Sequence, residues 1–278
     1  MRILAAVFIA VLAQGQNVKE IRFYSENVQC YGKIFLPAGF TVDGKSPAVV
    51  LAPGWGETAA SVEKYAARFA EKGMVAMAID YRGWGKSGGY VYLAENVQFD
   101  DRLRFSQHTA KVRIRRKRLI PDDQVDDIRN AISYLQGAPG VDRARIGVWG
   151  TGMSGAHAMV IAGIDPRIKT VVALAPVIAG KDVPRQLSKP DFQPTQVKLA
   201  RADSAAAALM SAEETKIALA EYHPFWFVSQ IPQTVAVLFL VEANDKSDAV
   251  AASKLLKGTT EVKPNAADAA AEWFAKYL

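Results

Sequence analysis

The fold is decided by one stretch of the chain, Arg145-Ile146-Gly147-Val148-Trp149-Gly150-Thr151-Gly152-Met153-Ser154-Gly155-Ala156-His157. A short apolar run ends in Gly150, and a turn of small residues follows it. A helical pattern then opens at Ala156, Met159, Val160 and Ala162. The order predicts a strand, a tight turn and a helix.

Continuous apolar runs elsewhere predict further strands that are buried on both faces, as in a parallel sheet. They are residues 48–52, 75–79, 170–175 and 234–240. Helical patterns lie between them, for example at 62–72, where Gly73 gives a stop signal. Residues 21–36 alternate in part and predict two antiparallel strands at a sheet edge. The sequence therefore predicts an α/β fold, with a mostly parallel central sheet and helices on both faces.

Composition limits the classes of protein that fit. The chain has 278 residues, half of them apolar, which suits a single domain with a large core. Its one cysteine, Cys30, excludes an intrachain disulfide. The sequence shows no metal-ligand cluster, and residues 83–87 lack the spacing of a phosphate-binding loop. We therefore expect no metal and no cofactor.

The first 13 residues have the pattern of a secretory signal. Arg2 gives the positive start, and the apolar run 3–13 is too short to span a bilayer. The alternative is a buried first strand. The signal predicts a secreted or periplasmic protein whose single domain covers residues 17–278, without nucleic acid as a partner. The sequence offers no candidate transmembrane segment.

Two segments stand apart from the strand and helix pattern. Residues 181–222 are rich in Ala, Gln and charge, and we expect a partly helical lid inserted at about 181–225. The segment 96–119 is polar and ends in a basic run, 111–118, in which charges alternate with Val112 and Ile114. With a net charge of +6 for the chain, this run fits an ordinary solvated ribbon. It also fits a contact with an acidic partner or an anionic lipid.

Three motifs together resemble the α/β-hydrolase superfamily. Residues 150–155 resemble its nucleophile elbow, G-x-S-x-G, and residues 80–87 are similar to its D-Y-R-G-x-G-x-S run. The flanks at 140–147 and 165–169 are similar to the dienelactone-hydrolase and acyl-peptidase-like branch of serine esterases. The resemblance covers roughly residues 18–278. It implies hydrolysis of an ester, lactone or small peptide by a nucleophile, an acid and a histidine, in that chain order.

By resemblance, two parts of such a site are present. The backbone N–H groups of Met153 and Trp55 would form the oxyanion hole, although Pro53 departs from the family's usual His-Gly. An ordinary Gly-rich turn is the alternative. Asp245 follows a predicted strand, as the family's acid does, and the alternative is a surface or helix-starting Asp.

The nucleophile position is the first departure. In the register set by Gly150 it holds Gly152, which has no side chain. A slipped register makes Ser154 the nucleophile, but it needs two more residues before the elbow. Otherwise Ser154 is a small residue that packs the helix against the strand.

The histidine is the second departure. The chain has three histidines, His108, His157 and His223, and none follows Asp245. His157 lies three residues beyond Ser154, and we expect it to be a packed helix residue.

The sequence therefore predicts a hydrolase-family protein of the ester- or lactone-hydrolysing class with an incomplete Ser-His-Asp triad. Its activity on a small ester or lactone-like molecule would be weak or altered. The alternative is a non-catalytic relative that binds a small ligand or a protein partner in the former pocket. The sequence gives no indication of oligomeric state.

Overall fold

The computed structural model describes residues 17–178, 194, 196–198, 200, 211–242, 247–266 and 268–278. The signal-like residues 1–13, Asp245 and most of the predicted lid lie outside these ranges, so the corresponding expectations remain predictions.

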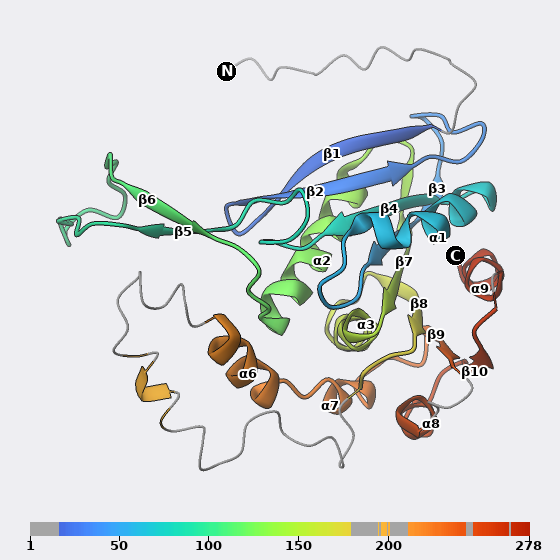
Figure 1. Cartoon of the computed structure of the whole chain (residues 1–278). Helices are drawn as coiled ribbons and strands as arrows, with labels where there is room; N and C mark the ends of the chain where they lie inside the picture. Colours follow the sequence, from blue (N-terminus) through green and yellow to red (C-terminus); the bar gives the residue numbers. More distant parts are fainter. Residues whose placement is uncertain are drawn as a thin grey trace.

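An eight-stranded sheet forms the centre of the described structure (Figure 1). Its strands, in spatial order, are β1 (Val18–Ser25), β2 (Val28–Phe35), β4 (Val75–Asp80), β3 (Ser46–Ala52), β7 (Val141–Thr151), β8 (Ile168–Leu174), β9 (Ala236–Val241) and β10 (Thr260–Pro264). From β4 to β10 neighbouring strands are parallel, whereas β1 and β2 form an antiparallel edge. The predicted mostly parallel sheet with an antiparallel edge is confirmed.

Helices cover both faces of this sheet, because its central strands are apolar on both sides. Along β3, Ala48, Val50 and Ala52 face one core cluster, while Val49 and Leu51 face the other. Helices α2 (Pro121–Gly137) and α3 (Met153–Ile164) pack into the first cluster. Helices α1 (Ala59–Glu71) and α9 (Ala269–Tyr277) pack into the second, and α8 (Ser247–Ser253) lies between β9 and β10 in the chain. The α/β fold expected from the sequence is confirmed.

The described part of the predicted lid is helical. It contains α6 (Ser211–Glu221), and the short α7 (Phe225–Val228) begins where the predicted lid ends. The backbone of α7 packs closely on α3, since a Cβ on Gly163 would lie 2.8 Å from the carbonyl oxygen of Phe227. Helix α7 therefore lies beside the helix that begins at the predicted elbow.

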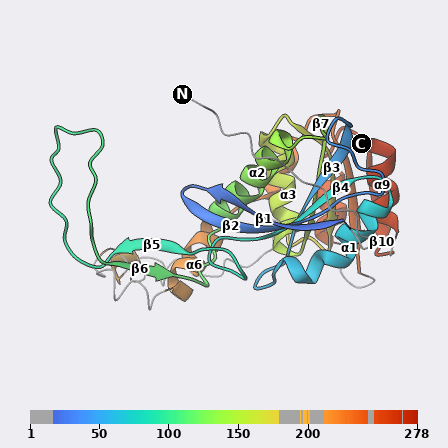
Figure 2. The same ribbon diagram turned by 90° about the horizontal axis from the view of Figure 1, so that it is seen from above.

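A two-stranded ribbon projects away from the sheet. Strands β5 (Tyr90–Leu93) and β6 (Val112–Arg115) are antiparallel and are joined by the loop 94–111. We call residues 90–118 the arm, and Figure 2 shows it extending well beyond the sheet and its helices. The sequence pattern missed β5, because a four-residue run such as 90–93 does not distinguish a strand from other structures. Among the described residues, no helix combines the length and apolarity needed to cross a bilayer.

Candidate active site

The turn after β7 places Gly152 at its tip. Strand β7 ends at Thr151, helix α3 begins at Met153, and Gly152 between them has φ 54° and ψ −119°. Its amide donates to the carbonyl oxygen of Leu174 at 2.9 Å, and its carbonyl accepts from the amide of Val177 at 3.1 Å. A residue with a side chain is strained in this conformation, so the turn suits glycine. The sharp turn therefore has Gly152 at its tip, and Ser154 follows in the first turn of α3.

The glycines of this turn differ in what surrounds them. A Cβ on Gly150 would lie 2.1 Å from the carbonyl oxygen of Ser154, and one on Gly155 would lie 2.9 Å from the Pro176 side chain. Among the residues that the structure describes, none has a heavy atom within 4 Å of a Cβ placed on Gly152. Close approach thus requires glycine at 150 and 155, whereas no described residue fills the space at Gly152, where the family places its nucleophile.

Ser154 lies in the first turn of α3 and is buried, with 1% of its surface exposed. Its hydroxyl donates to the carbonyl oxygen of Pro53 and accepts from the hydroxyl of Tyr81, with an O–O distance of 2.5 Å. A serine hydroxyl has a single hydrogen to donate, and here the carbonyl oxygen of Pro53 accepts that hydrogen bond. The hydroxyl of Ser154 therefore joins the start of α3 to the loop after β3 and to Tyr81, a contact that residue spacing does not indicate.

The two predicted oxyanion elements lie on adjacent strand ends. Ala52 at the end of β3 pairs with Gly150 near the end of β7, and the Ser154 hydrogen bond joins the loops that follow. In the β3 loop, the Glu57 carboxylate accepts from the amide of Gly54 at 3.0 Å. Within the described chain, neither the amide of Trp55 nor that of Met153 has an acceptor. The positive end of the α3 dipole adds to the attraction that these amides have for an oxyanion.

His157 is fully buried, as expected for a packed helix residue. Its Nε2 lies 2.9 Å from Oε1 of Gln124, and its Nδ1 lies 2.6 Å from the hydroxyl of Tyr222. The amide oxygen of Gln124 can only accept, so Nε2 carries the proton and the Tyr222 hydroxyl donates to Nδ1. Burial lowers the pKa of His157 to about 3, because the charged imidazole is poorly solvated there. The imidazole is therefore neutral, with both nitrogens occupied.

The other two histidines have partners elsewhere. His108 lies in the arm, where its Nε2 is 2.7 Å from the hydroxyl of Ser106. The ring of His223 stacks on that of Trp226, with centroids 4.7 Å apart. Asp245, the predicted acid, lies outside the described residues, just beyond the end of β9.

Two cavities flank Tyr222, the partner of His157. One, of about 350 Å³, is lined by Arg118, Asp122 and Glu214, among others. The other, of about 400 Å³, is lined by residues that include Asp126 and Trp226. Both lie beside α2 and α6, and Gly152 is not among their lining residues. No cluster of three or more potential metal ligands occurs within the part of the chain that the structure describes.

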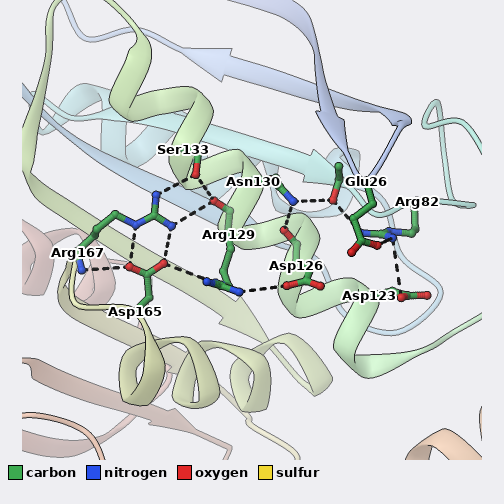
Figure 3. Close-up of polar contacts among 10 residues, drawn as sticks. Glu26, Arg82, Asp123, Asp126, Arg129, Asn130, Ser133, Asp165 and Arg167 are labelled. Atoms are coloured by element: carbon green, nitrogen blue, oxygen red, sulfur yellow. Dashed lines mark hydrogen bonds and ion pairs between the residues drawn. The ribbon is translucent and has the colours of Figure 1, made fainter. Parts of the chain in front are cut away.

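Ion pairs fix α2, the helix that carries Gln124 (Figure 3). At one end, Arg82 lies 2.7 Å from the Glu26 carboxylate and also pairs with the buried Asp127 at 2.8 Å. Further along, Arg129 lies 3.8 Å from Asp165, which also accepts from Arg167. These contacts hold α2 against the exit loop of β4 and the end of α3.

Comparison with known proteins gives the family of the chain. The model of the serine aminopeptidase S33 family matches residues 44–263. The chain is 30% identical over 138 residues to the thiohydrolase apmlB of Arthrinium phaeospermum, covering 49% of this chain and 37% of that protein. It is 26% identical over 162 residues to the quorum-quenching protein AidA of Acinetobacter baumannii, covering 58% and 44%. The chain thus spans less than half the length of these curated relatives.

Solved structures agree on the fold. A hypothetical protein from Pseudomonas aeruginosa, PA2218, superposes with a TM-score of 0.70 at 16% identity, covering 97% of this chain and 96% of that one. The α/β hydrolase GrgF from Penicillium sp. sh18 gives a TM-score of 0.64 at 16% identity, with 89% of both chains covered. The central sheet, the turn at Gly152 and the family match lead to one conclusion: the chain belongs to the serine aminopeptidase S33 family of α/β hydrolases.

Proposed function

We propose that this chain binds a small ester, lactone or related carbonyl compound at the oxyanion elements and hydrolyses it weakly at most. The observation that carries the proposal is Gly152. It occupies the strained tip of the elbow, where no described residue fills the space above it and where a hydrolase of this fold needs a nucleophilic side chain.

The binding half of the site supports this function. The amides of Trp55 and Met153 belong to neighbouring loops that the Ser154–Pro53 hydrogen bond joins. Backbone donors at a helix N-terminus stabilise the partial negative charge of a carbonyl oxygen. The similarity to the thiohydrolase apmlB supports a ligand of the acyl type.

The side chains near the turn, Ser154 and His157, support only weak hydrolysis. The hydroxyl of Ser154 is buried and donates to Pro53, so its proton has no base to accept it. The pKa of His157, about 3, is far below the value near neutrality that suits a general base. Loss of a nucleophile or a base typically lowers turnover by ~10⁴–10⁶.

The signal-like residues 1–13 support a secreted or periplasmic location for the protein.

A fluorophosphonate probe tests the catalytic half of the proposal. Such probes form a covalent bond with activated serines, so we expect no labelled peptide in the mass spectrum of the treated protein. A label on Ser154 at a rate typical of serine hydrolases would contradict the proposal.

Ligand-detected NMR with γ-butyrolactone and phenyl acetate tests the binding half. Met153→Pro removes the amide donor at a position where proline is tolerated, the first residue of a helix. Met153→Ala keeps that donor and is the matched control. We expect Met153→Pro to weaken binding and Met153→Ala to leave it unchanged, and equal binding by both variants would count against an oxyanion site.

A further inference from the structure

The arm presents a bare apolar face on one side of its ribbon. Register pairs Val91 with Ile114 and Leu93 with Val112, so these four side chains share a face. Their exposed fractions are 44–64%. An isolated two-stranded ribbon is marginally stable, and an exposed apolar cluster of this kind marks an interaction site.

The opposite face of the arm is fixed to the body of the protein. Arg115 is buried, and its guanidinium lies 3.1 Å from the Glu214 carboxylate of α6. Arg118 pairs with the same carboxylate at 2.9 Å and lies over the ring of Tyr90 at 4.9 Å. The hydroxyl of Tyr90 donates to Asp123 at the start of α2. The base of the arm is therefore held in place, with its apolar face directed away from these contacts.

The loop of the arm, residues 94–111, exposes apolar and basic side chains next to one another. Phe99, Leu103 and Phe105 have exposed fractions of 66%, 56% and 86%. Arg102 and Arg104 alternate with Leu103 and Phe105 along the chain and are also exposed. Figure 2 shows the loop as the part of the arm farthest from the sheet.

Charge is concentrated in the same segment. Residues 90–118 contain eight Lys and Arg but three Asp and Glu, so they carry +5 of the chain's net +6. The rest of the chain is close to neutral. An occupant of this surface must therefore accept positive charge and apolar side chains together.

We propose that the arm binds the surface of an anionic lipid bilayer. Exposed Phe and Leu side chains enter the boundary between headgroups and acyl chains, and neighbouring Arg and Lys side chains remain among the anionic headgroups. Each basic residue near such a surface adds attraction, and salt screens it. A second copy of the arm could cover the apolar face, but two arms that each carry a net charge of +5 would repel one another. The projection of the arm lets it reach a flat surface ahead of the rest of the molecule.

Vesicle flotation with the full chain tests the proposal. The vesicles are pure phosphatidylcholine or contain 30% phosphatidylglycerol, at low and high salt. We expect flotation with the anionic vesicles, little with the neutral ones, and a decrease as salt rises. An absence of binding to the anionic vesicles at low salt would overturn the proposal.

Two pairs of variants locate the contact. Arg104→Glu with Lys111→Glu reverses two exposed charges of the arm, and Lys254→Glu with Lys257→Glu reverses two exposed charges elsewhere. Leu103→Ser with Phe105→Ser removes apolar groups from the loop, and Val42→Ser with Leu255→Ser is its matched control. We expect each arm variant to weaken partitioning at least tenfold and each control to leave it within twofold. Equal effects of arm and control variants would overturn the proposal.

Light scattering and a soluble acidic polymer distinguish the other occupants. A dimer that forms without vesicles and is lost in Leu103→Ser with Phe105→Ser would assign the apolar face to a second copy and overturn the proposal. Arm-dependent binding to polyglutamate without binding to vesicles would assign the arm to an acidic protein and overturn it too. Unchanged melting temperatures establish that the variants are folded.

Discussion

The hydroxyl of Ser154 donates a hydrogen bond to the carbonyl oxygen of Pro53, joining the turn after β7 to the loop after β3. These two segments supply the amides of Met153 and Trp55. The serine nearest the elbow thus connects the two halves of the proposed binding site.

Ser154→Ala should destabilise the fold. It leaves the Pro53 carbonyl and the Tyr81 hydroxyl without their buried partner, which costs about 1–3 kcal/mol in the free energy of unfolding. Urea denaturation measures this change, and Ser229→Ala, at an exposed position, should stay within about 0.5 kcal/mol. A variant with unchanged stability but no remaining esterase activity would instead indicate a nucleophile.

Gly152→Ala should also destabilise the protein, through backbone strain. Because a Cβ at 152 meets none of the described residues, the cost comes from the φ of 54° and ψ of −119°, and we expect about 1–3 kcal/mol. Gly137→Ala is the matched control, since a Cβ at 137 also meets none of the described residues but Gly137 ends a helix with ordinary φ. That substitution should be neutral or stabilising. A higher melting temperature for Gly152→Ala would contradict this account of the turn.

His157 should make stability depend on pH. Burial lowers its pKa from 6.5 to about 3, so the unfolded chain binds more protons than the folded chain between these values. The contribution of the neutral His157 to the free energy of unfolding is fully present above pH 6.5 and is lost as the pH falls towards 3. The loss between pH 7 and pH 5 is about 2 kcal/mol, at 1.36 kcal/mol per unit of pKa shift.

Comparison with His157→Gln isolates this effect from the buried carboxylates. The difference in unfolding free energy between the two proteins should shift by about 2 kcal/mol in favour of the variant as the pH falls from 7 to 5. A constant difference across this range would show that His157 can be charged in the folded protein.

The sequence predicted the sheet well because buried parallel strands are continuous apolar runs. All six residues of β4 and all six of β9 are buried, and these two strands were expected within one or two residues at each end. The ribbon strand β5 was missed, since four residues carry little periodicity.

The turn at Gly152 could be predicted from the sequence, whereas the partners of Ser154 and His157 could not. The spacing from Gly150 placed Gly152 at the turn, because a strand followed directly by a helix constrains that turn locally. The partners of Ser154 and His157 come from loops and helices distant in the chain, for example Pro53 and Tyr222. Such contacts depend on tertiary packing, which spacing does not encode. Asp245 remains a prediction from resemblance.

We propose that the chain binds an acyl-type ligand at the amides of Trp55 and Met153 and hydrolyses it weakly at most, because Gly152 has no nucleophilic side chain and His157 is buried. The turnover of Gly152→Ser with p-nitrophenyl acetate tests this proposal most directly. No described residue blocks a side chain at position 152, but a serine hydroxyl is a poor nucleophile unless a base takes its proton. We predict a rate close to that of the parent protein, with larger gains only when a histidine-bearing loop is also introduced between Val262 and Asn265. Ordinary esterase turnover by Gly152→Ser alone, roughly 1–10³ s⁻¹, would show that a base is already in place and would contradict the account.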